Sequence, residues 1–198
     1  MLRDDFYQSL VSAAQQPPQE RHLTLTDLHM EAINYYLETI RNITSQRAMR
    51  VVRDSRTVAQ VVAHIAEWDR AVILAVGEVL AGVTWPWLMS QTVTIEPDGN
   101  VRSFASVDEF NAYYALKYAG QPWKDIQGVA LDMATMLHQL FVHPGIVTPE
   151  QLEGTRRYDY RLPTGVTLTI PCGWYLWMVT LEHEMVEHAA DLKVGREA

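Results

Sequence analysis

Histidine and glutamate side chains crowd a short segment near the end of the chain, where residues 181–188 read LEHEMVEH. If this segment is an α-helix, residues four apart point in nearly the same direction, whereas residues five apart diverge by about 140°. His183 and His188 are therefore not expected to share one metal ion. Two pairs on a common face remain, His183 with Glu187 and Glu184 with His188.

The apolar stripe of the same segment distinguishes the two pairs. His188 falls within that stripe, Glu184 lies at its edge and His183 lies roughly opposite. The stripe itself consists of Trp177, Leu181, Met185 and Leu192. A third donor comes from a distant segment, because His64 lies on the apolar stripe of another predicted helix. The sequence thus predicts a metal site formed by His64, Glu184 and His188.

The predicted ligand set indicates which chemistry such a site would support. Two imidazoles and one carboxylate suit zinc, nickel or iron(II), and three protein ligands leave a position for water or substrate, as in catalytic sites. Asp191 either orients a ligand or is an exposed charge. Glu67 and Asp69, which flank Trp68, are expected to be solvated, and a general base at Glu67 is the alternative. An alternative without metal is that the inward side chains hydrogen-bond one another or a backbone carbonyl.

Four amphipathic segments of helical period position these residues. They cover residues 24–43, 58–80, 123–143 and 174–195, and Asp54 or Ser55 is the expected N-cap of the second. A short helix over 106–118 lies within the long connection 83–120. Alternating patterns over 158–162 and 166–170 predict a hairpin. The expected fold is therefore an all-α four-helix bundle with an inserted short helix and a small β-hairpin before the last helix.

The first 22 residues are expected to form an arm outside the core, because they end in a polar, proline-containing stretch. Residues 23–198 then form the bundle domain.

Composition limits the classes of partner. A formal charge of −8 disfavours nucleic acid, and no apolar run approaches the roughly 20 residues that span a bilayer. The single Cys172 excludes an internal disulfide and multi-cysteine metal sites. The start of the chain lacks the pattern of a secretory signal, so a cytoplasmic protein that acts on a small molecule, without nucleic acid or membrane, is expected. A homodimer is compatible with such a bundle.

Two segments resemble motifs of a known superfamily. Residues 58–68, VAQVVAHIAEW, are similar to the second-helix motif of the DinB/YfiT-like metal-binding four-helix bundles, and residues 184–192, EMVEHAADL, to their fourth-helix motif. Glu184 stands where common members have histidine, which resembles the His, Glu, His site of the mycothiol-dependent maleylpyruvate isomerase branch. The resemblance implies a divalent metal, often zinc or nickel, and in characterised branches a low-molecular-weight thiol that ionises at the metal.

The residues predict a metal-dependent enzyme with an open His64, Glu184 and His188 site, and the resemblance implies the thiol-dependent transferase or isomerase kind. Two alternatives remain open. One is a metal-dependent hydrolase that uses bound water, and the other is a non-enzymatic small-molecule-binding or stress-response bundle with a structural metal. The 83–120 insertion departs from the minimal bundle, so the substrate does not follow from the resemblance.

Overall fold

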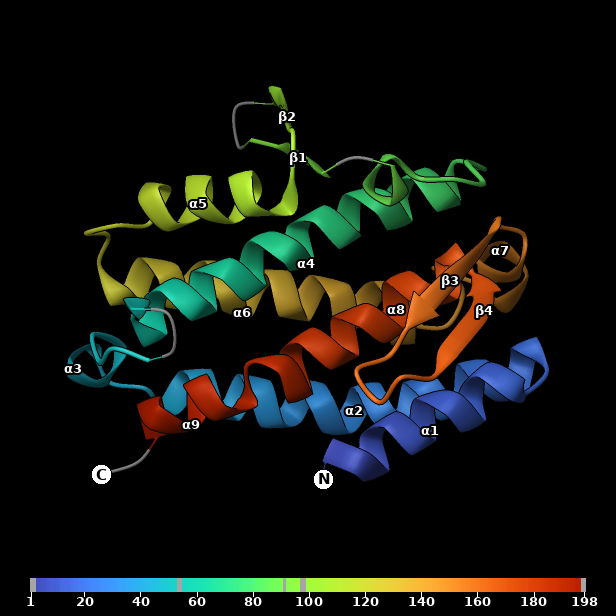
Figure 1. Ribbon diagram of the computed structural model, residues 1–198, viewed down its shortest axis with the longest axis horizontal. Helices are drawn as coiled ribbons and strands as arrows, with labels where there is room; N and C mark the ends of the chain where they lie inside the picture. Colours follow the sequence, from blue (N-terminus) through green and yellow to red (C-terminus); the bar gives the residue numbers. More distant parts are fainter. Residues whose placement is uncertain (1–2, 53–54, 91, 97–98, 197–198) are drawn as a thin grey trace.

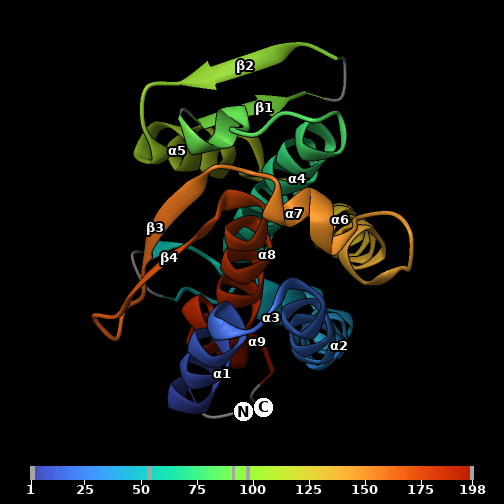
Figure 2. The same cartoon turned by 90° about the vertical axis from the view of Figure 1, so that its right-hand side faces the viewer.

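The long helices form a four-helix bundle, as the sequence predicts (Figures 1 and 2). The computed structural model describes residues 3–52, 55–90, 92–96 and 99–196. Both α4 and α2 contact α6 on one side and α8 on the other. The four bundle elements are α2 (Pro18–Asn42), α4 (Val58–Leu80), α6 (Trp123–Val142) and a composite element of α8 (Cys172–Glu182), the π-helical turn η3 (His183–Glu187) and α9 (Ala189–Arg196).

Helix α4 begins and ends where its apolar period does. Its N-cap is Thr57, whose side chain accepts a hydrogen bond from the backbone N–H of Gln60 while the Gln60 side chain bonds back to the Thr57 N–H. This capping box replaces the caps expected from the sequence: Ser55 has a positive φ of 61° and does not cap the helix, and Asp54 lies outside the described residues. The Thr57 box fixes the start of the helix that carries His64.

The N-terminal segment packs against the core, so the expectation of an arm outside it is wrong. Residues Arg3–Gln15 form α1, in which Phe6, Tyr7 and Leu10 are buried. Pro18 stands at the first turn of α2, where a missing N–H is tolerated, so the prolines begin a helix rather than a linker. Arg21 donates to the carbonyl oxygens of residues 13, 14 and 16 and fastens the bend between the two helices.

The insertion runs back along the outside of α4, so that α6 starts at the same end of the bundle as α4 (Figure 1). Its helix α5 (Val107–Lys117) matches the predicted short helix and is capped by Ser106. The sequence did not predict the 3-10 turn η2 (Trp87–Met89) or the antiparallel pair β1 (Thr92–Ile95) and β2 (Val101–Phe104). Both η2 and β1 lie against α4, and Leu88 and Met89 of η2 line a hollow near the site.

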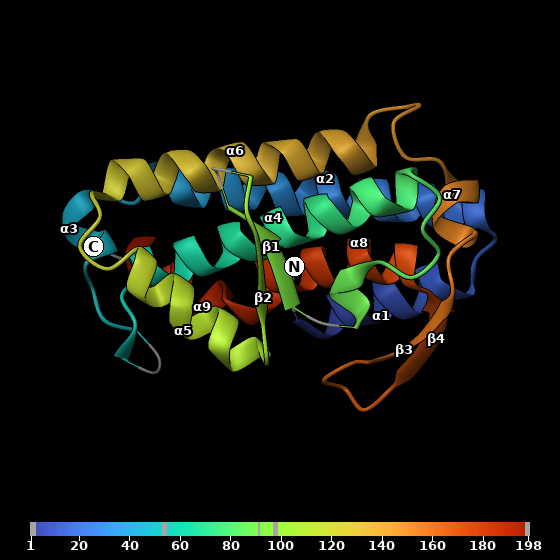
Figure 3. The same ribbon diagram turned by 90° about the horizontal axis from the view of Figure 1, so that it is seen from above.

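The predicted hairpin before the last helix is confirmed. Strands β3 (Arg157–Arg161) and β4 (Thr167–Pro171) pair antiparallel with Tyr160 opposite Leu168, and Gly165 takes the positive φ of 89° that the turn requires. Two short helices that the sequence did not predict are α3 (Ser45–Ala48) and α7 (Pro149–Glu153). Helix α3 and the hairpin lie at opposite ends of the bundle (Figure 3).

Among the described residues, two apolar clusters make up the core, and a polar layer that includes residues 182–191 separates them. On α4, residues up to Ala66 belong to one cluster and residues from Val72 to the other. On the fourth element the same change occurs between Leu181 and Leu192. The charged and histidine-rich run 182–191 therefore lies between the two apolar clusters rather than at an end of the bundle. No described helix combines the length and the apolarity needed to cross a bilayer.

Candidate metal centre

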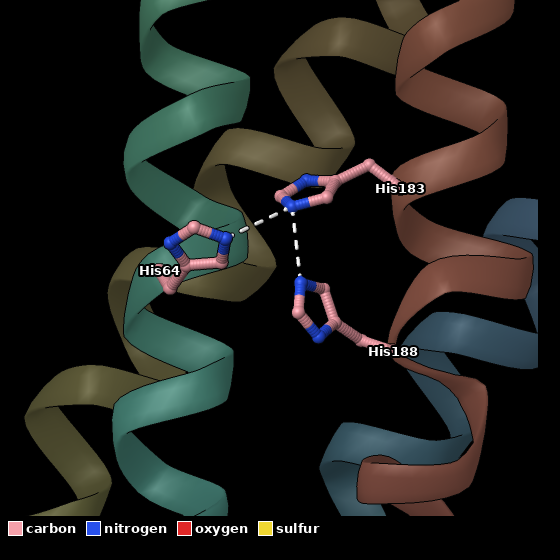
Figure 4. A group of neighbouring side chains, drawn as sticks. All are labelled: His64, His183 and His188. Atoms are coloured by element: carbon pink, nitrogen blue, oxygen red, sulfur yellow. Dashed lines mark hydrogen bonds between the residues drawn. The ribbon is translucent and has the colours of Figure 1, made fainter. Parts of the chain in front are cut away.

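Three histidines from two elements converge inside the polar layer (Figure 4). His64 comes from α4, whereas His183 and His188 come from the two ends of the η3 turn. The Nε2 atom of His183 lies 3.1 Å from Nε2 of His64 and 3.2 Å from Nε2 of His188. One ligand atom from each of the three lies within 4.8 Å of the others. The structure thus brings His64 and His188 together, as the sequence predicts, and adds His183.

The π-helical turn explains why His183 joins the group. In a π-helix the hydrogen bonds run from i to i+5, so residues five apart lie one above the other instead of diverging. The prediction that His183 and His188 point in different directions assumed a regular α-helix and is wrong for this segment. The sequence shows the two histidines, but their spacing of five residues does not by itself reveal the wider turn that directs both into one interior.

Glu184 does not join the three histidines, in contrast to its predicted place in the ligand set. Its side chain is fully buried, and neither carboxyl oxygen has a hydrogen-bond partner among the described residues. It interacts electrostatically with Asp69 and Tyr36. Burial raises the pKa of Glu184 well above its usual range, with Asp69 adding to the effect. The same wider turn that brings in His183 directs Glu184 elsewhere.

Burial keeps the three imidazoles in the form that binds metals. Desolvation lowers the pKa of His64 to about 3, lowers that of His183 well below its ordinary value and lowers that of His188. The neighbouring rings and the charge of Arg56 act in the same direction. Neutral imidazoles offer a lone pair on one ring nitrogen, which is the form that coordinates metal ions.

Two polar side chains, Asp191 and Asn111, contact the rings. Asp191, which is 5% exposed, places Oδ2 3.3 Å from Nδ1 of His188, so that this nitrogen carries the proton and Nε2 keeps its lone pair. This contact decides between the two expectations for Asp191: it orients a histidine and is not an exposed charge. Asn111 of α5 is hydrogen-bonded to His64 and accepts a hydrogen bond from Nε1 of Trp68 at 3.3 Å.

The donor set fits a divalent ion. Metal–nitrogen bonds of 2.0–2.1 Å at tetrahedral angles place two ligating nitrogens about 3.3 Å apart, close to the 3.1 and 3.2 Å separations observed here. Without an ion the arrangement is poorly satisfied, because His183 has one Nε2 facing two others and can donate one proton at most. With an ion all three lone pairs gain a partner. The residues present therefore fit a metal held by His64, His183 and His188.

A cavity of about 250 Å³ opens beside His64 and His183. Asp69 and Asn111 also line it, and Trp68 and Tyr175 provide aromatic walls. A small molecule in this space would reach the histidine pair directly. The geometry is that of a centre with protein ligands on one side and an accessible position on the other.

The two acidic residues that flank Trp68 are buried, so the expectation that they are solvated is wrong. Glu67 accepts a hydrogen bond from the hydroxyl of Tyr118 and pairs with Arg70 at 3.1 Å, which ties the end of α5 to α4. Asp69 is 1% exposed, and its Oδ2 has no partner among the described residues. Burial raises the pKa of Asp69 well above its usual range.

Comparison with known proteins gives one informative likeness. No family model matches the sequence, and no curated protein matches it. Among solved structures, the chain is similar to the crystal structure of a histidine-to-alanine mutant of the mycothiol-dependent maleylpyruvate isomerase, with a TM-score of 0.60 and 13% sequence identity. The match covers 91% of this chain and 62% of that chain, so the present chain spans less than two thirds of that protein's length. At this identity the likeness establishes a related fold.

Proposed function

We propose that the chain is a metal-dependent enzyme of the thiol-dependent transferase or isomerase kind, with one divalent ion held by His64, His183 and His188. The observation that carries the proposal is the convergence of three imidazoles, in which Nε2 of His183 lies 3.1 and 3.2 Å from the other two Nε2 atoms, separations that one ion would bridge. Zinc and nickel are the proposed metals, since both accept imidazole nitrogen. A bound divalent ion would supply a Lewis acid that lowers the pKa of a thiol or water beside it.

The chain's own residues have separate tasks in this proposal. His64, His183 and His188 hold the centre, and Asp191 fixes the ring of His188 through Nδ1. Trp68 and Tyr175 exclude water from the adjoining cavity, and they present apolar surface to whatever binds there.

The proposed ligand set differs from the one that the sequence resemblance implies. The proposed third ligand is His183, whereas the resemblance implies Glu184. Three imidazoles leave the centre with the full charge of the divalent ion, whereas a carboxylate ligand would remove one unit of it. A centre of higher charge would lower the pKa of a thiol or water beside it further. The two ligand sets therefore predict different acidities at the same site.

The fold likeness supports the thiol-dependent kind of chemistry, since the similar solved structure is that of a mycothiol-dependent isomerase. A small-molecule substrate is proposed rather than nucleic acid or membrane, because the chain carries a formal charge of −8. A cytoplasmic location and a homodimer remain parts of the proposal. The hydrolase alternative would use the same three histidines and no thiol.

Elemental analysis of protein purified without chelators tests the proposal. We expect about one equivalent of zinc or nickel per chain, and less than a tenth of that in a His64→Ala, His188→Ala double variant. A matched control is His143→Ala, which removes an exposed histidine that is not one of the three in the group. Absence of a stoichiometric metal from wild-type protein, even after incubation with zinc or nickel and desalting, would refute the proposal.

A second measurement separates the thiol-dependent kind from the hydrolase. The metal-loaded protein is assayed against a panel of electrophilic and ester substrates with and without low-molecular-weight thiols. Turnover that requires the thiol supports the transferase or isomerase kind. Turnover of esters that is equally fast without any thiol would support the hydrolase instead.

A further inference from the structure

A second hollow continues from the cavity beside the histidines. It measures about 240 Å³ and shares five of its lining residues with the first, so the two form one slot. The shared residues are Trp68, Val72, Val107, Tyr175 and Val179. One end of the slot therefore meets the histidines, and the other extends away from them between α4, α8 and the insertion.

The chemistry of the walls changes along the slot. At the near end His64, His183, Asp69 and Asn111 supply nitrogen and oxygen atoms. At the far end the additional lining residues are Leu88, Met89, Tyr158 and Leu176, and no charged side chain lines this part among the described residues. A ligand that fills the whole slot needs a polar head at one end and an apolar body at the other.

The insertion builds one wall of the slot. Leu88 and Met89 come from η2, while Val107 and Asn111 come from α5. The opposite walls belong to the bundle helices α4 and α8 and to Tyr158 of β3. A four-helix bundle closes its core without such an insertion, so these residues are free to determine what the slot accepts.

We infer that this slot binds a small amphiphilic ligand, whose thiol or other metal-coordinating head lies at the histidines and whose uncharged aliphatic or aromatic body lies against Leu88 and Met89. The inference rests on the proposed function for the head group only. The apolar end selects the body by burial, and each additional buried methylene should tighten binding about fourfold. A charged body would be desolvated there without an ionic partner among the described lining residues.

A series of thiols tests the inference on cobalt-substituted or zinc-loaded protein. Binding of 2-mercaptoethanol, 1-butanethiol and 1-hexanethiol is measured by absorption of the cobalt–sulfur bond and by calorimetry. We expect 1-hexanethiol to bind roughly 16-fold more tightly than 1-butanethiol, from two further buried methylenes. Equal dissociation constants along the series, or preference for 2-mercaptoethanol, would overturn the inference.

Two variants locate the effect. Leu88→Asp should abolish the dependence on chain length and leave binding of 2-mercaptoethanol within about twofold of wild type. The matched control is Leu116→Asp, at a residue that is 77% exposed on the insertion helix α5 and does not line the slot. It should keep the full dependence. If both variants lose the dependence equally, or neither does, the slot is not where the body binds.

A readout that does not depend on the metal separates this inference from the proposed function. The methyl resonance of Met89, identified by its loss in Met89→Leu, should shift when 1-hexanethiol is added to protein with or without metal. A shift in metal-free protein that takes up no zinc or nickel would sustain the slot and refute the metal centre. A metal-loaded protein in which this methyl does not shift would refute the slot and leave the centre standing.

Discussion

The assignment of the third ligand can be tested by exchanging neighbouring residues. His183 lies 3.1 and 3.2 Å from the other two imidazoles, whereas the carboxyl of Glu184 lies outside the group and faces Asp69 and Tyr36. We therefore expect His183→Gln to remove metal binding and Glu184→Gln to preserve it. Both changes replace a side chain by a neutral amide of similar size at a buried position, so each serves as the control for the other.

The magnitude follows from linkage between binding and folding. At a free metal concentration 100 times the dissociation constant, binding to the native state stabilises wild-type protein by about 2.7 kcal/mol. For a chain of this size that raises Tm by about 5–11 °C. Loss of one of three ligands should weaken binding more than about 100-fold, which is the upper range for loss of a merely orienting partner. His183→Gln should then gain less than about 0.4 kcal/mol at the same metal concentration.

Differential scanning calorimetry with and without zinc measures both values, and nickel serves as a second metal. Glu184→Gln should show nearly the wild-type rise in Tm. Its metal-free form should be no less stable than wild type, because the carboxyl that it removes has no hydrogen-bond partner among the described residues. A Glu184→Gln protein without the rise, beside a His183→Gln protein that keeps it, would refute the structural assignment and restore the ligand set inferred from the sequence.

Three further outcomes follow from contacts elsewhere. Asp191→Ala should weaken metal affinity 10- to 100-fold, roughly, in a competition titration with a chelator, because His188 loses the partner of its Nδ1. Gly173→Ala should lower the free energy of unfolding in urea by about 1–3 kcal/mol, because an added Cβ would lie 2.8 Å from backbone atoms of Leu152. Burial lowers the pKa of His29 to about 3. Below about pH 6.5 this histidine therefore binds a proton in the unfolded chain but stays neutral in the folded chain. Stability should therefore fall by about 1.2 kcal/mol per pH unit from this residue as the pH drops from 6 to 4, and urea titrations of His29→Gln should lack that part of the slope.

The sequence was most informative where one period ran without interruption. The predicted limits of α4, 58–80, coincide with the observed helix, because its apolar residues recur regularly and Gly82, with a positive φ, follows its end. The hairpin before α8 was equally clear, since the period changes to two and a glycine turn joins the strands.

Competing signals account for the errors. Residues 17 and 18 are both proline, and they led to the prediction of an arm outside the core. The apolar residues of α1 are buried because they pack against distant parts of the chain. The sequence does not mark the π-helical turn, because the extra residue in that turn is stabilised by tertiary contacts of the side chains. In a regular α-helix, Glu184 would lie beside His188 and be the third ligand. In the observed π-helical turn, His183 lies beside His188 instead, so a shift of one residue changes the identity of the third ligand.

The polar layer links the fold to the proposed chemistry through the protonation of its histidines. In water an imidazole with a pKa of about 6.5 is roughly three-quarters protonated at pH 6, and protons then compete with a metal for the same lone pair. Apolar clusters on both sides of the layer dehydrate His64 and lower its pKa to about 3. Protons therefore do not compete at His64 until the solution is far more acidic. Burial destabilises the protonated form of His64, and for the same reason it keeps the imidazole in the neutral form that binds a metal.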